Sequence, residues 1–389
     1  MNRTNKYHNI LQIINLAGSA RNFIGGQFEY LRRHGYNMHL ICTPDDLIYD
    51  YVKENHVKYK PVLLMRTLSI WNDVKSFFMI CKYIKDNNID TVIAHQAKAR
   101  LLGTTAAFVM NVPNRIVFAH GVVFETLVGF KRRLIILIDK IVAAMSHKTV
   151  CVSRSVAKVR QDYHIEKSER VYILGSGTCG GIDTKNMFNP IRLDVKEQEL
   201  LKSKFGIEKD DFVVGFCGRM VRDKGVKELV EGFDLVKQRL IDKKIKLFII
   251  GDSEARDSID KELVTYINNH VCIIHVKKIE HTEMYKYLAL FNVIVLPSYR
   301  EGFGMVTIEA GAMNVPAIVS KSTGCIDSIV DGKTGLYCEI TPESIAKKIE
   351  FMIDNPIRTK EMGRSARELI VNKYDSSIIW PYVIDVIEA

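Results

Sequence analysis

Several motifs that commonly assign a function are missing from this chain. No GxGxxG follows the first apolar run, which argues against a dinucleotide oxidoreductase. No GxxxxGK[ST] motif occurs either. The eight cysteines form neither a CxxC pair nor a Cys/His cluster, and no set of His, Asp and Glu has metal-ligand spacing. We therefore expect reduced thiols, as in the cytosol, and no bound metal.

Long hydrophobic runs are missing as well. No stretch has 18 or more consecutive apolar residues, so the sequence predicts no membrane-spanning helix. The first ten residues, MNRTNKYHNI, are polar, and we expect no secretory signal there. The chain has 389 residues with 47% hydrophobic and 26% charged side chains, values typical of a soluble globular protein. This length predicts two domains, each with its own core.

Apolar, strand-like runs alternate with helical patterns along both halves of the chain. In the first half we expect strands at Ile10–Leu16, Met38–Cys42, Thr91–His95, Arg115–Ala119, Thr149–Val152 and Val171–Leu174, with helices such as Ile24–His34, Trp71–Asp86 and Arg132–Ser146. In the second half we expect strands at Phe212–Cys217, Lys246–Gly251, Val271–His275, Val293–Pro297 and Ala317–Ser320. Such alternation predicts two doubly wound parallel sheets, joined at the polar segment Asp183–Asp194, with ligands bound outside the carboxyl ends of the strands.

The most informative segment begins where one of these strands ends, at Pro297. A loop with Glu301 follows, and then a helix that begins near Gly304 and carries Glu309. A helix N-terminus offers unpaired N–H donors and a partial positive charge, which suits a diphosphate. The donors here would be the backbone N–H groups of Gly304, Met305 and Val306. Taken alone, however, a helix-start acid and a solvated helix face explain the two glutamates more simply.

The segment EGFGMVTIE, from Glu301 to Glu309, resembles the E-x7-E signature of glycosyltransferase family 4. The resemblance implies that Glu301 accepts hydrogen bonds from sugar hydroxyls and that Glu309 accepts them from the ribose hydroxyls of a nucleotide-sugar donor. The resemblance places further donor contacts at Phe303, Gly304, Met305 and Val306. A second element, Gly215–Gly225, resembles the family's G-R-x4-K-G element, in which Arg219 and Lys224 would clamp the diphosphate. Two cations after a strand can neutralise the charge of a departing nucleotide diphosphate. The alternative is two surface cations, and the two elements taken together argue against it.

The first half of the chain resembles the family more weakly. Gly25 and Gly26 stand between the first strand and a helix, where the family has a glycine loop near the donor, but an ordinary loop pair is nearly as good an explanation. His120 ends the run Arg115–Gly121, at a position where the family has a histidine near the donor sugar, and a structural histidine is the equal alternative. At Gly180 the family more often has Asn, so the contact made by that side chain is in doubt.

The resemblance covers nearly the whole chain, and it implies the GT-B fold: two facing Rossmann-like, doubly wound α/β domains with an interdomain cleft. Residues 1–187 would bind the acceptor and residues 193–373 the nucleotide sugar, while a C-terminal helix over 376–389 would pack back on the first domain. The turn-rich stretch 322–335 is similar to that of bacterial capsule and O-antigen members. The implied activity is retaining and metal-independent, with no cofactor. The donor would be a nucleotide-diphosphate sugar, in most such relatives a UDP-sugar, with GDP left open, and the acceptor a glycan on a polyprenyl diphosphate.

The charge is unevenly placed. Residues 1–190 contain 26 Lys or Arg and 14 Asp or Glu, a balance of +12, whereas the rest contains 29 and 31. A basic first half predicts peripheral binding to the inner face of the cell membrane, with Lys131, Arg132 and Arg133 as the contact cluster beside Phe130 and Leu134. Solubility charge alone is the plainer alternative.

Two rival functions stay open. A sugar-nucleotide 2-epimerase of GT-B fold would share the donor motifs. A nucleic-acid binder would suit the pI of about 9.0, but a single-strand groove needs aromatics interleaved on a basic face. The stretch Lys131–Arg133 instead leads into the apolar run Leu134–Ile138, so we expect no nucleic-acid partner.

Overall fold

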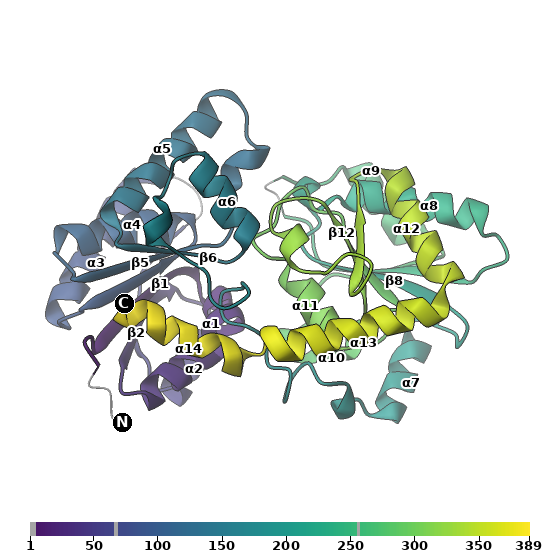
Figure 1. Ribbon diagram of the computed structural model, residues 1–389, viewed down its shortest axis with the longest axis horizontal. Coiled ribbons are helices and arrows are strands. Elements are labelled where there is room, and N and C mark those ends of the chain that lie inside the picture. Colours follow the sequence, from purple (N-terminus) through teal and green to yellow (C-terminus); the bar gives the residue numbers. More distant parts are fainter. Residues whose placement is uncertain (1–4, 66–68, 255–256) are drawn as a thin grey trace. The chain divides into compact units, whose positions relative to one another are not determined.

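The computed structural model describes residues 5–65, 69–254 and 257–389. The chain forms two compact units (Figure 1). Unit 1 contains Met1–Gly181 and Ser377–Ala389, and unit 2 contains Ile182–Ser376. Among the described residues, no helix is both long and apolar enough to cross a bilayer.

Unit 1 is built on a seven-stranded sheet in the order β3-β2-β1-β4-β5-β6-β7, in which every pair is parallel. Its strands are β1 Asn9–Leu16, β2 Asn37–Thr43, β3 Lys58–Pro61, β4 Thr91–His95, β5 Asn114–Ala119, β6 Lys148–Cys151 and β7 Val171–Tyr172. The central strand β4 is buried along its whole length, as expected for a parallel strand covered on both faces. The strand order reverses between β1 and β4, so the loops after these two strands open the crevice of this sheet.

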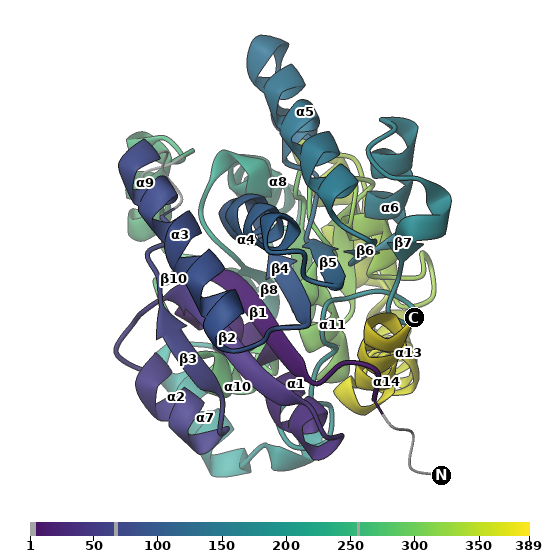
Figure 2. The ribbon, with the colours of Figure 1, turned by 90° about the vertical axis from the view of Figure 1, so that its left-hand side faces the viewer.

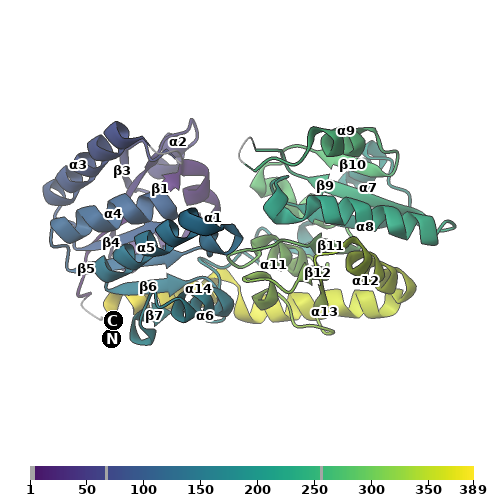
Figure 3. The same cartoon turned by 90° about the horizontal axis from the view of Figure 1, so that it is seen from above.

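Helices cover both faces of this sheet (Figures 1 and 2). On one face lie α1 Ala17–Arg33, α2 Ile48–Glu54 and the C-terminal helix α14 Ser376–Glu388. On the other lie α3 Ile70–Asp86, α4 Ala97–Val109 and α5 Gly129–Met145, side by side (Figure 3), and α6 Arg154–Asp162 precedes β7. Aliphatic side chains of β1, β4, α3 and α4 form one buried core of this unit.

Unit 2 has a six-stranded parallel sheet in the order β10-β9-β8-β11-β12-β13. Its strands are β8 Phe212–Cys217, β9 Ile245–Ile250, β10 Ile273–Val276, β11 Val293–Leu296, β12 Ala317–Ser320 and β13 Gly335–Cys338. Its helices are α7 Val195–Lys204, α8 Val226–Arg239, α9 Lys261–Asn269, α10 Met284–Leu288, α11 Met305–Ala312, α12 Pro342–Asp354 and α13 Pro356–Lys373. The strand order reverses between β8 and β11, so the crevice of this sheet opens where those two strands end.

The prediction of two doubly wound parallel sheets is confirmed, and each of the eleven expected strands overlaps an observed one. Two short strands were not predicted. One is β3, whose sequence Lys-Tyr-Lys-Pro is exposed at the sheet edge, and the other is the four-residue β13. The first helix also differs, because α1 begins at Ala17, directly after β1, and not at Ile24.

Candidate active site

The loops after β8 and β11 lie side by side in unit 2, because the two strands are neighbours in the parallel sheet. The first loop ends in a short 3-10 turn, Arg222–Lys224, before α8 begins. Gly225 joins the turn to the helix with a φ of +65°, and a Cβ there would lie 2.2 Å from the carbonyl oxygen of Pro297 in the second loop. Only glycine permits both this backbone conformation and this approach. The two motifs found in the sequence are therefore in direct contact through their backbones.

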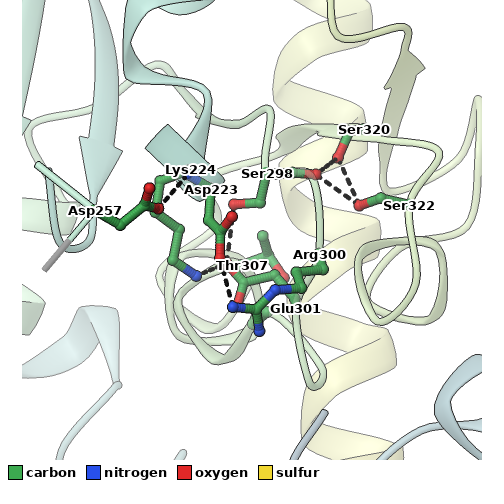
Figure 4. A network of polar contacts seen from close by, with 10 residues as sticks. Asp223, Lys224, Asp257, Ser298, Arg300, Glu301, Thr307, Ser320 and Ser322 are labelled. Atoms are coloured by element: carbon green, nitrogen blue, oxygen red, sulfur yellow. Dashed lines mark hydrogen bonds and ion pairs between the residues drawn. The ribbon is translucent and has the colours of Figure 1, made fainter. Parts of the chain in front are cut away.

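Lys224 and Glu301 meet between these loops (Figure 4). The Lys224 ammonium donates to Oε1 of Glu301, and the hydroxyl of Ser298 donates to the same oxygen at 2.9 Å. The Lys224 and Glu301 side chains are only 13% and 16% exposed, so their charges are poorly screened by water. The predicted clamp lysine and the predicted sugar-binding glutamate therefore form a fixed pair.

The loop that carries Glu301 is held by hydrogen bonds to two other segments of unit 2. Asp223 accepts from the backbone N–H of Tyr299 at 2.8 Å through its carbonyl, and from the Arg300 guanidinium at 2.5 Å through its carboxylate. The backbone N–H of Glu301 donates to the carbonyl of Thr323 at 2.9 Å. Gly324, with a φ of +82°, leaves room for that contact, since a Cβ there would lie 2.5 Å from the Glu301 carbonyl oxygen.

Two serines, Ser320 at the end of β12 and Ser322 at the start of the turn-rich stretch, support the start of the loop. The hydroxyls of Ser320 and Ser322 both donate to the carbonyl oxygen of Ser298, at 2.5 and 2.7 Å (Figure 4). Ser298 and Ser320 are fully buried. The stretch after α11 that resembles capsule and O-antigen proteins thus acts on the site indirectly, by fixing the backbone on which Glu301 stands.

Helix α11 begins at Met305, directly after this loop. Gly304 is its N-cap, in the left-handed conformation, with no side-chain cap and no acidic residue in the first turn. The positive end of the helix dipole is therefore not offset by a carboxylate within that turn, so it remains available to an anionic group. The predicted contacts Met305 and Val306 form the first turn. The side chain of Phe303 is buried and packs on the ring of Tyr374, with 5.2 Å between ring centroids.

Glu309 is a buried side chain, with 7% of its surface exposed, so the interpretation as a solvated helix face is wrong. Its Oε1 pairs with Nε2 of His281 at 3.0 Å. Burial lowers the pKa of His281, but the hydrogen bond and negative charge of Glu309 outweigh it and hold that pKa above its usual value. His281 was missed by the sequence analysis, because it lies 28 positions before Glu309 in the sequence and nothing local links the two residues.

Arg219 follows β8, as expected, but its side chain is half exposed. Its guanidinium pairs with the carboxylate of Glu254 at 2.9 Å, whereas the ammonium that pairs with Glu301 is that of Lys224. The structure thus joins two of the predicted catalytic residues directly and places Arg219 beside a different acid. Among the described residues, no group of three or more His, Cys, Asp or Glu could hold a metal ion.

His120, in unit 1, ends a buried hydrogen-bond chain at the carboxyl end of β5. Its Nε2 lies 2.9 Å from Nδ1 of His95, and Nε2 of His95 lies 3.1 Å from Oε1 of Gln12. Burial, helped by the positive charge of Arg100, lowers the pKa of His120 to about 4, and burial also holds the pKa of His95 well below its usual value. Both imidazoles are therefore neutral at neutral pH. Nε2 of His120 is engaged in the hydrogen bond with His95.

Gly25 and Gly26 do not form a loop after β1, which corrects the prediction. Both lie within α1, where glycine is unfavourable unless close packing requires it. The carbonyl of Gly25 accepts from the hydroxyl of Tyr51 at 2.7 Å. A Cβ at Gly26 would lie 2.8 Å from the indole of Trp380, so this glycine allows α14 to pack on α1.

Comparison with known proteins places the chain in a family. The model for "Glycosyltransferase Family 4" matches residues 26–178, and that for "Glycosyl transferases group 1" matches residues 197–369. The chain is 30% identical to the capsular polysaccharide biosynthesis glycosyltransferase CapM of Staphylococcus aureus, over 91% of this chain and 90% of that protein. It is 24% identical to UDP-Gal:alpha-D-GlcNAc-diphosphoundecaprenol alpha-1,3-galactosyltransferase of Escherichia coli, over 94% and 92%.

A solved structure shares the fold. The crystal structure of Anabaena HepE in complex with UDP-glucose superposes with a TM-score of 0.79 at 14% sequence identity, covering 97% of this chain and 98% of that one. The family models match the segments that hold both donor motifs and His120, and the similarity to CapM extends over nearly the full length. The chain therefore belongs to the group 1 glycosyltransferases of family 4, with the GT-B fold, and is a glycosyltransferase.

Proposed function

We propose that the chain is a retaining, metal-independent enzyme that moves a hexosyl or N-acetylhexosaminyl group from a UDP-sugar to a glycan on a polyprenyl diphosphate, in the assembly of a bacterial capsule or O-antigen. The observation that carries this proposal is the Lys224–Glu301 pair beside the N-terminus of α11. Such a site suits an anionic leaving group next to a sugar. The name of the E. coli relative supports the acceptor class and the UDP donor, and the name of the S. aureus relative supports a role in capsule assembly.

In this proposal unit 2 binds the donor and unit 1 the acceptor. The bond between the sugar anomeric carbon and the diphosphate oxygen breaks, and the acceptor hydroxyl bonds to that carbon on the same face. The departing phosphate oxygen takes the acceptor proton. Lys224 and Arg219, together with the N-terminus of α11, stabilise the charge on the diphosphate. Glu301 accepts hydrogen bonds from hydroxyls of the sugar, and Glu309 accepts them from hydroxyls of the ribose. For neutral His120, a place near the donor sugar stays a prediction.

Donor binding and transfer test this function directly. UDP is expected to raise the melting temperature of the protein more than GDP does, because a ligand that binds only the native state stabilises it by mass action. With a UDP-sugar and a polyprenyl-diphosphate glycan, product analysis is expected to show an elongated acceptor with retained anomeric configuration. Conversion of the UDP-sugar to its 2-epimer without any acceptor would instead establish the rival epimerase. An increase in melting temperature with oligonucleotides, but with no nucleotide sugar, would favour the nucleic-acid binder.

We further propose that unit 1 docks on an anionic membrane surface through the start of α5. Lys131 and Arg133 are exposed there, and the neighbouring Phe130 is 77% exposed. Arg132 is partly engaged inside the protein, because its guanidinium lies over the ring of Tyr163, 5.4 Å from the centroid. Each cation near an anionic surface contributes about 1 kcal/mol, and salt screens this attraction.

The docking is tested by vesicle sedimentation. Wild-type protein is expected to bind anionic vesicles, to bind neutral vesicles weakly and to be released by high salt. Changing Lys131, Arg132 and Arg133 together to Ser should weaken this binding while UDP affinity stays unchanged. The double change Lys131→Ser/Arg133→Ser is the matched control for lost packing, since it keeps the Arg132–Tyr163 contact. Equal vesicle binding by wild type and triple variant would contradict the docking model.

A further inference from the structure

Helix α3 carries an exposed apolar face that the sugar-transfer site does not use. Ile70, Trp71, Val74 and Phe78 are 77%, 87%, 46% and 64% exposed. Their spacing of three and four residues places them on one side of the helix. The opposite side is buried and packs into the core of unit 1 through Ser76, Ile80 and Ile84. The exposed side is therefore a continuous strip across the outer surface of the unit, and we call it the α3 strip.

Positive charge borders the α3 strip. Lys75, Lys82 and Lys85 are exposed on the same helix. Of the two acids in α3, Asp73 is paired with Lys98 at 2.5 Å and Asp86 with Lys82 at 3.2 Å. Apolar side chains bordered by lysine, with tryptophan among them, match the composition of helices that lie in the interface of an anionic bilayer.

The topology places the α3 strip on the same side of unit 1 as the docking helix α5. Both helices pack on one face of the sheet, with α4 between them (Figures 2 and 3). Since they precede strands of a parallel sheet, both begin at the carboxyl edge, where His120 follows β5. Helix α5 has an exposed apolar strip of its own, formed by Phe130, Leu134, Leu137 and Ile141.

We propose that the α3 strip is a second membrane contact, with Trp71 seated at the headgroup level of the inner-leaflet lipids. The inference rests on the proposed docking through α5 and adds a second contact to it. A second copy of the chain fits the strip less well. Its four side chains offer on the order of 500 Å², below the roughly 800 Å² per partner of a standard interface. Self-pairing would also bring lysines such as Lys75 and Lys85 of two copies near one another, whereas an anionic surface attracts them.

The two tryptophans of the chain, Trp71 and Trp380, allow a direct test. In the Trp380→Phe variant, Trp71 is the only indole, and its emission is expected to shift to the blue when vesicles of mixed phosphatidylglycerol and phosphatidylcholine are added. Lipids brominated near the headgroup end of the chain should quench it. The Trp71→Phe variant is the matched control, because Trp380 packs against Tyr30 and Gly26 and should not respond. The difference between wild type and Trp71→Phe gives the same information without altering the packing of Trp380.

A second control places an exposed indole elsewhere. Val271 in unit 2 is 94% exposed, so Val271→Trp in a background lacking both natural tryptophans should show neither shift nor quenching. Replacing Trp71 by Ser, at a position exposed enough to spare the fold, should weaken vesicle binding about tenfold.

The outcomes separate the two proposals. If the protein sediments with anionic vesicles and Trp71 stays unshifted and unquenched, the α3 contact is wrong while docking through α5 stands. If no vesicle binding occurs although sugar is transferred to a soluble acceptor, docking fails as a whole. A Trp71 blue shift that depends on protein concentration without any vesicles, together with dimers in sedimentation velocity, would assign the strip to a second copy and overturn the proposal.

Discussion

Replacing Lys224 by alanine is expected to lower kcat for sugar transfer by about 10²- to 10³-fold, the loss typical when one preorganised donor to a developing charge is removed. Negative charge builds on the diphosphate as the bond to the sugar breaks, so the ammonium stabilises the transition state more than the bound donor. Lys224 is well placed for this because it is only 13% exposed, so water screens its charge weakly. The half-exposed Arg219 should show a smaller effect when changed to Ala.

Initial rates at saturating donor measure this effect, with circular dichroism to confirm the fold. Lys227→Ala is a matched control, since Lys227 stands one turn away, 60% exposed, in an ion pair with Glu231. Activity of the wild type should persist in EDTA. An unchanged kcat in folded Lys224→Ala would remove the lysine from the mechanism, and complete loss in EDTA that Mg²⁺ reverses would contradict metal independence.

The contact between Lys224 and Glu301 complicates a single substitution. Removing the lysine leaves the carboxylate of Glu301 with Ser298 as its remaining described partner, and an uncompensated, mostly buried charge is unfavourable. A double-mutant cycle with Glu301→Gln separates the two contributions. If the pair acts as a unit, the double variant should lose little more kcat than Lys224→Ala alone. Strictly additive losses would show that each residue acts independently.

The pattern of apolar runs was sufficient to predict the parallel sheets, because strands buried on both faces must be apolar along their length. One of the two strands that escaped prediction, β3, lacks that property. Lys58–Pro61 pairs only with β2 at the edge of its sheet, and its side chains are largely exposed. The start of α1 escaped for another reason. The glycine pair suggested a loop, whereas Gly26 lies inside the helix, where a Cβ would lie only 2.8 Å from the indole of the distant Trp380.

The donor motifs were found because each lies within one short segment of sequence. The partners of those residues could not be found in this way. Glu309 meets His281 across 28 residues, and His120 meets His95 across 25. Contacts of this kind depend on which strands become neighbours, and a single sequence does not reveal that pairing. One feature of the sequence could have pointed to His95. It is the last residue of an apolar strand, and His120 directly follows another such strand.

Replacing Glu309 by alanine is expected to weaken UDP binding roughly tenfold to hundredfold, because charge-assisted hydrogen bonds worth about 1.5–3 kcal/mol would be lost. The helix should form without it, since alanine is well tolerated in a helix. Calorimetric titration with UDP measures the loss. His281→Gln is the control for indirect effects, because it removes the partner of Glu309 and leaves the carboxylate in place.

Analogues that lack the ribose hydroxyls make the assignment of Glu309 specific. Wild-type protein should bind UDP more tightly than 2′,3′-dideoxy-UDP, because the analogue leaves a buried carboxylate, 7% exposed, without its ligand hydroxyls. Glu309→Ala should bind both nucleotides with similar, weakened affinity, since the group that distinguishes them is gone. His281→Gln should retain most of the preference for UDP. If folded Glu309→Ala still prefers UDP to the analogue as strongly as wild type does, the ribose must be held by another residue, and the role of Glu309 is to fix His281.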